Sequence, residues 1–270
     1  RAGGIAEEDV LEDISGGCAA TVAYLDGSDW GGTNTGVSVD ADGVLSGSKF
    51  MVPDAAQATW IAVVGSDAAG DAVVALVAGS DVTAQAQASH ALIDLTKRAS
   101  TLDFTGVKAQ RVLSGDKVAS AIRDYLLIGA LLTAAEAVGS TSACLAGIVD
   151  YLKTRKQFGK LIGSFQALKH PTVDIYVGME HSRSLVYHAS SEIDDGPLST
   201  EAEVACRMAK AKASDTIQYA GDRSVQFHGG FGFTWECDSS LFIRRAAWSQ
   251  QQFGDAMHHR KRLAPLLLDA

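Results

Sequence analysis

One long run of helix-forming residues sets the main limit on how this chain can fold. Residues 117–155, "KVASAIRDYLLIGALLTAAEAVGSTSACLAGIVDYLKTR", carry Ala and Leu at helical spacing throughout. Further helical runs follow at residues 164–193, 199–230 and 239–268. Four long helices joined by short connections predict an antiparallel bundle.

The ends of these helices carry local signals. Pro171 is expected in or near the first turns of the second helix. Thr200 and Glu203 have capping-box spacing, which predicts that the third helix opens at Thr200. Gly229–Gly230 predicts its end, and the fourth helix is expected to break near Gly254.

The residues before the long helix follow a different period. Residues 17–112 contain short apolar runs between Gly and Asp turn signals, as in "TWIAVVG", "SDAAGD" and "DAVVALVAG". Regular short strands of this kind predict a β-barrel or sandwich. The fold class is therefore α+β, with a β domain followed by a helical bundle.

Composition excludes several classes of protein. A formal net charge of −9 argues against nucleic-acid binding, which needs clustered Lys and Arg. No uninterrupted apolar run reaches the ~20 residues that span a bilayer, so no membrane partner is expected. The beginning lacks the pattern of a signal peptide and looks like the middle of something longer. Four cysteines without paired spacing predict a reduced, cytoplasmic protein.

The histidines favour no metal site. His170, His181 and His188 fall on one predicted helix, and polar packing is preferred to a metal for them. His258–His259, with the basic residues that follow, is interpreted as the basic end of a helix.

The stretch "TRKQFGKLIGSFQ", residues 154–166, combines cations, a ring and glycines after the first bundle helix. One interpretation is a helix end, where basic residues meet the negative end of the dipole. The other is an anion site, with Arg155 for a phosphate and Phe158 for a flat heterocycle. "QFHGGFGF", residues 226–233, favours the second, because paired glycines let backbone N–H groups approach an anion.

Together, "YLKTRKQFGKLIGSFQALKH" and "QFHGGFGFTWECDSSLFIRRAA" resemble the acyl-CoA dehydrogenase family of flavoproteins. The resemblance implies a middle β domain over residues 17–112 and a C-terminal helical bundle over residues 113–270. Residues 1–16 would be a remnant of the family's N-terminal helical domain. In this family the matching residues hold the ADP part of an FAD that lies mainly on a neighbouring subunit. The residues that match are Arg155, Phe158, Gln166, Gln226, Gly229 and Gly230.

The flavin-ring side of the family pattern is altered. Thr21 and Gly27–Asp29 remain, but the family's Glu-Pro after the Thr is absent and the spacing differs. Lys49 is kept, whereas Met51 and Pro53 stand where the family has Trp and Thr. Proline has neither a hydroxyl nor an N–H to bond the flavin.

The family's catalytic base also lacks a clear match. Its Glu removes the α-proton of an acyl-CoA while a hydride leaves the β-carbon for FAD. The commonest position of that Glu matches Phe253, and the alternative position on the first bundle helix lies at or beside Gly129. Asp255 is the nearest acid but is offset by two positions.

Three hypotheses follow from these matches. The first is a non-catalytic subunit of a heteromeric acyl-CoA dehydrogenase, resembling the degenerate subunit of the actinobacterial steroid side-chain type. Its implied partners are a paralogous subunit with the catalytic Glu, an acyl-CoA that includes steroid-CoA among the candidates, and an electron-transfer flavoprotein-type acceptor. The second is a self-sufficient homo-oligomer that uses Asp255 or another base. The third is an interaction scaffold without flavin.

Overall fold

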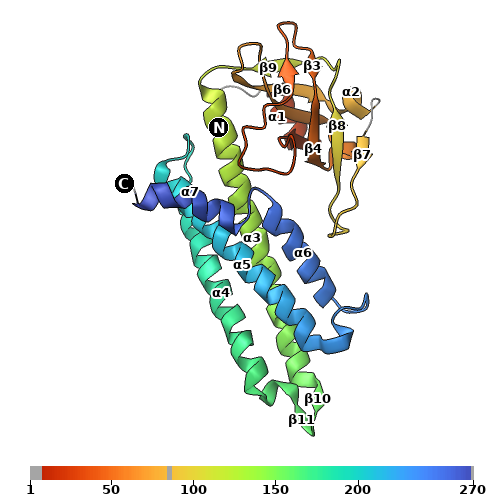
Figure 1. Ribbon diagram of the computed structural model, residues 1–270, viewed down its shortest axis with the longest axis vertical. Helices are drawn as coiled ribbons and strands as arrows, with labels where there is room; N and C mark the ends of the chain where they lie inside the picture. The colour runs from red at the N-terminus through yellow and green to blue at the C-terminus, as the bar shows by residue number, and fades with distance from the viewer. Residues whose placement is uncertain (1–7, 84–86, 269–270) are drawn as a thin grey trace. The chain divides into compact units, whose positions relative to one another are not determined.

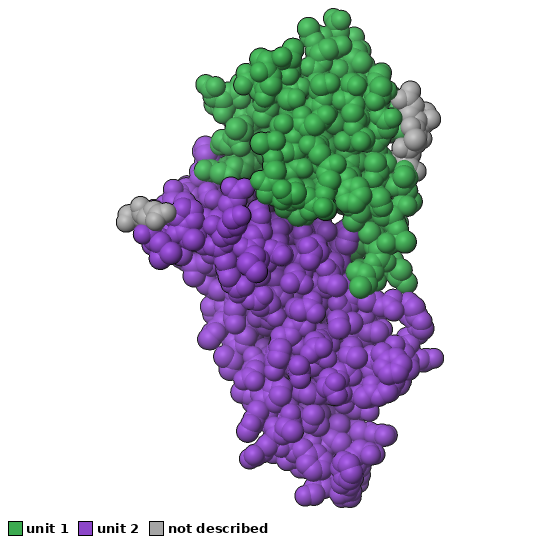
Figure 2. Space-filling model, in the orientation of Figure 1, with its two compact units in different colours: residues 1–124 green, residues 125–270 purple. Residues whose placement is uncertain are grey.

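The computed structural model describes residues 8–83 and 87–268 of the chain. The chain divides into two compact units, residues 1–124 and residues 125–270, coloured separately in Figure 2. Most of the strands belong to the first unit and most of the helical residues to the second, as the labels in Figure 1 show, so the α+β expectation is confirmed. Residues 1–7 of the predicted N-terminal remnant lie outside the described residues.

Unit 1 contains two sheets. The larger has the order β3-β2-β5-β6-β9, with β1 paired to β5, and the smaller has the order β4-β8-β7. The elements are α1 (Glu8–Ser15), β1 (Ala20–Ala23), β2 (Ser38–Val39), β3 (Leu45–Ser46), β4 (Ser48–Pro53), η1 (Ala55–Gln57), β5 (Trp60–Ser66), β6 (Ala72–Ala78), α2 (Gly79–Thr83), β7 (Gln87–Ser89), β8 (Ala99–Asp103) and β9 (Arg111–Leu113). Both sheets contribute to one hydrophobic core, in which Ile61, Leu102 and Phe104 are fully buried.

The central hairpin forms as the sequence predicts. β5 and β6 pair antiparallel along their whole length, and every second residue of β6 is buried. The turn between them is closed by Asp67, whose carboxylate accepts the backbone N–H groups of Ala69 and Asp71. β1 pairs with β5 in parallel, which no hairpin signal predicted, because a long loop separates β1 from the strands that follow it.

The long predicted helix is α3 (Lys117–Thr154). By length and composition alone it is apolar enough to cross a membrane, a test that the core helix of a soluble protein also passes. Within unit 2 it supplies residues to two hydrophobic clusters, with Leu127 and Ala134 in one and Cys144 and Ile148 in the other. α3 therefore behaves as a core helix of unit 2.

The remaining elements of unit 2 are short strands and helices around α5. They are β10 (Lys156–Gln157), β11 (Lys160–Leu161), η2 (Ile162–Ser164), α4 (Gln166–Ser191), α5 (Thr200–His228), η3 (Gly229–Phe231), α6 (Ser239–Gln251) and α7 (Ala256–Leu268). α5 packs against α4, α6 and α7, so it is the central helix of this unit. The predicted fourth helix is two helices, broken at residues 252–255 beside Gly254 as expected.

Two local predictions were wrong. The N-cap of α5 is Ser199, not Thr200, because the Ser199 hydroxyl accepts the backbone N–H of Ala202. Glu203 instead bonds Arg207 one turn later. His258–His259 lies in the first turn of α7 rather than at its basic end, and His259 is buried.

Candidate functional site

The stretch after α3 forms a two-residue hairpin. β10 pairs antiparallel with β11, and Phe158 and Gly159 at the tip have φ values of 52° and 77°. Two successive positive φ angles are typical of the tight turns that match strand twist. The tip carries the Phe158 ring into solvent, 88% exposed. Its only ring neighbour among the described residues is Phe165, edge-on at 6.2 Å between centroids.

Arg155 lies at the base of this hairpin. Its backbone N–H donates to the Tyr151 carbonyl at 2.9 Å, and its own carbonyl accepts the Ile162 N–H at 2.9 Å. The backbone is therefore fixed while the side chain is exposed. Across residues 8–83 and 87–268, the Arg155 guanidinium has no side-chain partner. Gln166 is the exposed first residue of α4, at the other end of the same loop.

The glycine pair lies at the end of α5. Gly229 has φ 62°, a conformation that favours glycine, and its N–H donates to the Gln226 carbonyl. Gly230 follows in η3, and a Cβ at either glycine would meet nothing within 4 Å. The space in front of this backbone is open to a ligand.

An aromatic stack joins the two segments. The Tyr151 and His228 rings lie 4.2 Å apart at 29°, and Tyr151 also donates to the His228 carbonyl at 3.5 Å. Ile162 and Phe227 belong to one hydrophobic cluster with the end of α3. The contacts of Tyr151 with His228 and of Ile162 with Phe227 therefore bring together the segments that carry the six predicted residues: Arg155, Phe158, Gln166, Gln226, Gly229 and Gly230. Their arrangement offers a cation, a ring, amides and open backbone to an anionic, planar ligand.

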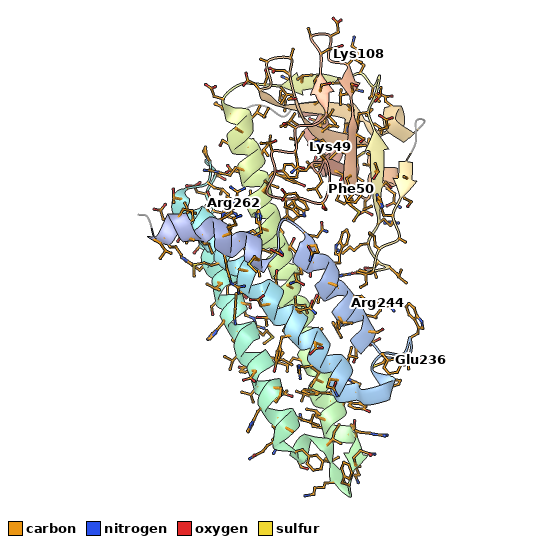
Figure 3. All side chains as sticks on the ribbon, in the orientation of Figure 1. Lys49, Phe50, Lys108, Glu236, Arg244 and Arg262 are labelled. Atoms are coloured by element: carbon orange, nitrogen blue, oxygen red, sulfur yellow. The ribbon has the colours of Figure 1, made fainter. Side chains whose placement is uncertain are left out.

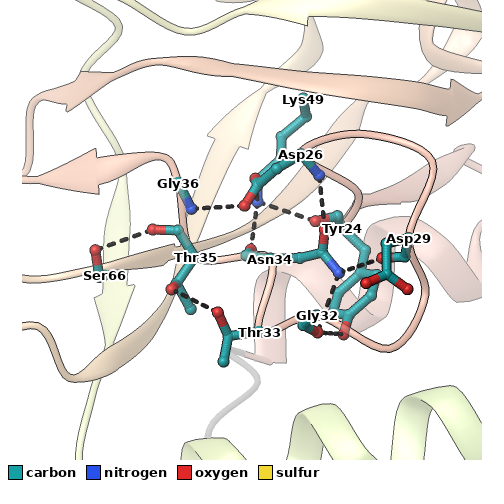
Figure 4. A network of polar contacts seen from close by, with 10 residues as sticks. All are labelled: Tyr24, Asp26, Asp29, Gly32, Thr33, Asn34, Thr35, Gly36, Lys49 and Ser66. Atoms are coloured by element: carbon teal, nitrogen blue, oxygen red, sulfur yellow. Dashed lines mark hydrogen bonds and ion pairs between the residues drawn. The ribbon is translucent and has the colours of Figure 1, made fainter.

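Lys49 in unit 1 is used internally. Its side chain is fully buried, and its ammonium donates to the carbonyls of Tyr24 at 2.9 Å and Asn34 at 2.5 Å and to the Asp26 carboxylate at 2.5 Å (Figure 4). Burial lowers the pKa of Lys49, an effect that the Asp26 carboxylate opposes. The Asn34 amide bonds the backbone of Asp26 and Asp29. Lys49 thus anchors a self-bonded loop over residues 24–36.

The positions matched to the flavin-ring side are also internally satisfied. The Thr21 hydroxyl donates to the Pro53 carbonyl at 2.7 Å. Met51 has φ 53°, where the pairing of β4 with β8 shifts register. None of these three residues carries an aromatic ring, and the hydroxyl hydrogen of Thr21 is already donated to the Pro53 carbonyl.

The two positions matched to a catalytic base lie against each other in unit 2. A Cβ built on Gly129 would be 2.3 Å from Cε1 of Phe253, so the ring occupies the space beside Gly129. Tyr125 packs edge-on against the same ring at 5.6 Å. A cavity of about 370 Å³ opens here, lined by Tyr125, Ile128, Gly129, Leu132, Thr133, Glu136 and Phe253.

Glu136 is a carboxylate of this cavity that the sequence analysis missed. It forms an ion pair with Arg245 of α6. Glu136 lies seven residues beyond Gly129 on α3, or roughly 10 Å along the helix axis at 1.5 Å per residue. That distance is too long for Glu136 to replace a base at Gly129. The preceding residue of α6, Arg244, has a different partner. Its guanidinium lies 4.0 Å from the centre of the exposed Trp235 ring (Figure 3).

Asp255 does not join the six residues at the other end of the unit. Its carboxylate accepts the His258 N–H at 2.7 Å and caps the start of α7. Beside it lie Lys210 and His259, two buried groups that the sequence analysis did not select. Burial lowers the pKa of Lys210 to about 7, against the attraction of Asp255. Burial, followed by the charge of Lys210, lowers the pKa of His259 to about 3.

A signal for Lys210 was present in the sequence. It lies on the same helical stripe as Cys206, Ala213 and Ile217, all of which are buried. A lysine at a core position of an Ala-rich helix indicates a paired internal cation. His259 gave no comparable signal, because it stands beside exposed basic residues.

Comparison with known proteins identifies relatives of the helical unit. Residues 119–265 match the family profile described as "Acyl-CoA dehydrogenase, C-terminal domain". Acyl-CoA dehydrogenase IpdE2 of Mycolicibacterium smegmatis is 39% identical over 134 residues, which cover 50% of this chain and 40% of that protein. The protein of the same name from Mycobacterium tuberculosis is 41% identical, covering 45% and 36%. The chain therefore spans less than half the length of these relatives in the matched segments.

Solved structures resemble both units. The ChsE4-ChsE5 complex from Mycobacterium tuberculosis superimposes with a TM-score of 0.81 at 25% identity, over 96% of this chain and 69% of that one. A glutaryl-coenzyme A dehydrogenase bound to glutaryl-CoA superimposes with a TM-score of 0.84 at 23% identity, over 92% and 66%. The second likeness shows the fold alone.

Proposed function

The chain belongs to the acyl-CoA dehydrogenase family, and from this premise we propose that it is a subunit of a heteromeric enzyme that oxidises an acyl-CoA thioester between its α and β carbons. Members of this family are FAD-dependent flavoproteins. In the proposal this chain presents the ADP-binding surface for FAD. A paralogous subunit supplies the pocket for the flavin ring and the glutamate that takes the α-proton.

The ADP side of the proposed site fits the chemistry of the cofactor. Arg155 is an exposed guanidinium suited to a pyrophosphate, and Phe158 is a ring suited to packing against the ligand. Gly229 and Gly230 leave open space where a Cβ would stand. When bound, FAD supplies the oxidant that accepts hydride from the β-carbon.

The carrying observation for a non-catalytic role is the contact between Phe253 and Gly129. An apolar ring fills the space at both positions matched to the base, and it cannot take a proton. Asp255, the nearest acid in sequence, accepts a backbone N–H at the start of α7. Thr21, Met51 and Pro53 likewise support assignment of the flavin-ring pocket to another subunit.

The substrate and partners are part of the same proposal. Similarity to the ChsE4-ChsE5 complex, which contains two different proteins, supports a paired assembly with a relative of this chain. The presence of a structure described as a steroid acyl-CoA dehydrogenase among the relatives favours a steroid-derived acyl-CoA. An electron-transfer flavoprotein-type protein is the expected acceptor, and the cytoplasm the expected compartment.

FAD content tests the assignment of half-sites. The chain expressed alone is expected to be colourless or poorly soluble, and the complex with its paralogue to be yellow. The measurement is FAD per chain, from absorbance after identical purification with and without the partner. One FAD per copy of this chain by itself would favour a self-sufficient enzyme, and a well-formed complex without FAD would favour a scaffold.

Arg155→Ala is expected to weaken FAD retention in the complex by roughly tenfold to a hundredfold. The reason is the loss of a charge-assisted contact to phosphate, worth on the order of 1.5–3 kcal/mol. Retention is measured as flavin released on dilution. Lys153→Ala is the matched control, because Lys153 is an exposed cation two residues earlier in the last turn of α3. Equal retention by both variants would contradict the role of Arg155.

A further inference from the structure

The turn between α6 and α7 has an unfavourable backbone. Phe253 has φ 57° and Gly254 has φ 93°, so two successive residues are in the left-handed region. A bulky residue such as Phe rarely adopts this conformation, and it persists where the surroundings hold it. The groups that hold this turn therefore decide where the Phe253 ring lies.

Lys210 contacts the end of α6, just before the turn. It lies on α5 with its side chain fully buried, and its ammonium donates to the carbonyls of Ser249 at 3.0 Å and Gln250 at 3.1 Å. The Ser214 hydroxyl takes a third bond at 2.9 Å. The last carbonyls of a helix have no partner within that helix and carry its negative dipole end. Lys210 thus caps the end of α6 from inside the core.

His259 holds the next carbonyl along the chain. Its Nε2 lies 3.0 Å from the Phe253 carbonyl, and since that oxygen can only accept, Nε2 carries the proton. The side chain is 2% exposed, and within the described part of the chain its Nδ1 has no hydrogen-bond partner. The side-chain hydrogen bond of this buried histidine is therefore made to Phe253, the residue with the strained backbone.

The backbone of residue 253 determines the contact with α3. The Phe253 ring fills the space beside Gly129, where even a methyl group would overlap it. It also meets Tyr125 edge-on. Because the ring is carried by the backbone of residue 253, a rotation of the turn would change its position beside Gly129 and Tyr125.

We propose that Lys210 and His259 are positioning residues, which hold the carbonyls of residues 249, 250 and 253 so that the Phe253 ring stays seated against Gly129. The functional consequence, that the ring occupies the position of the family's catalytic base, rests on the proposed function. The positioning itself rests on the contacts within unit 2. The alternative is that both groups merely fill the core and stabilise it.

The test places 4-fluorophenylalanine at position 253 in the full chain, purified with its partner where solubility requires it. Its ¹⁹F resonance reports the surroundings of the ring, and hydrogen exchange of the peptide over residues 249–256 reports the backbone. Lys210→Met and His259→Leu each remove one support. Ser214→Ala removes a bond to Lys210 without touching the turn, and Lys212→Met makes the same exchange at a lysine that lines a cavity between α4, α5 and α7.

We expect Lys210→Met and His259→Leu to move the ¹⁹F resonance toward its value in unfolded protein and to speed exchange of the peptide at least tenfold. The two controls should leave both signals in place even where they lower the melting temperature. If Lys210→Met does not fold, Lys210→Arg, which keeps donors for the two carbonyls, is expected to retain the resonance, and His259→Leu still tests the seat. Lower melting temperatures with an unmoved resonance in both supporting variants would overturn the proposal. Neither readout depends on FAD or turnover, so it can fail independently of the proposed function.

Discussion

Asp255→Asn is expected to leave turnover of the assembled dehydrogenase nearly unchanged, while removal of the glutamate from the paralogous subunit lowers kcat by several orders of magnitude. A general base must lie within hydrogen-bond reach of the proton that it takes, and the position matched to it here is filled by Phe253. Asp255 accepts the His258 N–H at the start of α7 instead. Asparagine caps a helix about as well as aspartate, so stability should change by less than about 1 kcal/mol.

A steady-state assay with an acyl-CoA and an artificial electron acceptor separates the possibilities. FAD content and melting temperature of each variant are measured on the same preparations, so that loss of fold is not mistaken for loss of chemistry. A thousandfold or larger fall in kcat for Asp255→Asn, with FAD bound and the fold intact, would show that this chain runs the reaction itself. The half-site proposal would then be abandoned for a self-sufficient enzyme.

Acidification is expected to destabilise unit 2 through His259. The folded protein holds its pKa at about 3, whereas the unfolded chain protonates this group near 6.5. Between these values the unfolded state binds more protons than the folded state, so the free energy of unfolding falls as the pH falls. The loss from pH 7.5 to pH 4.5 is on the order of 2–3 kcal/mol from this group alone.

Denaturant unfolding of wild type and His259→Gln across pH 4.5–7.5 measures the effect. The difference between the two pH profiles reports His259 together with its coupling to Lys210, whose pKa of about 7 lies in the same range. The variant should show a flatter profile, and its amide can still donate to the Phe253 carbonyl. His188→Gln is a control at an exposed histidine, and it should keep the wild-type slope. Parallel profiles for wild type and His259→Gln would refute the prediction.

Much of the fold could be predicted because its signals are local. β5 and β6 follow from two apolar runs around an Asp-rich turn, and α3 follows from uninterrupted helical spacing. The break near Gly254 was also visible, since glycine ends or interrupts helices. The residues of the proposed ADP-binding surface were selected by two sequence motifs. The structure brings these two motifs together, and the role of the residues remains a prediction.

The features that the sequence did not predict depend on contacts between residues that are distant along the chain. The parallel pairing of β1 with β5 requires a loop whose path is set by Lys49, a contact that no periodicity reveals. The seat of Phe253 beside Gly129 joins positions on α3 and after α6, and only the folded chain brings them together. His259 was predicted at the basic end of a helix because charged residues follow it in the sequence. In the folded chain it is buried and lies within the influence of the Lys210 charge.

The β10–β11 hairpin bears on the order of events during assembly. Because Phe158 and Gly159 close a two-residue turn with paired strands on either side, the ring is displayed before any partner arrives. Little conformational entropy is then lost at the tip when two subunits meet, which favours docking of a preformed surface over folding upon binding. In the proposed heteromer, exchange of subunits would then be limited by their separation rather than by refolding of this tip.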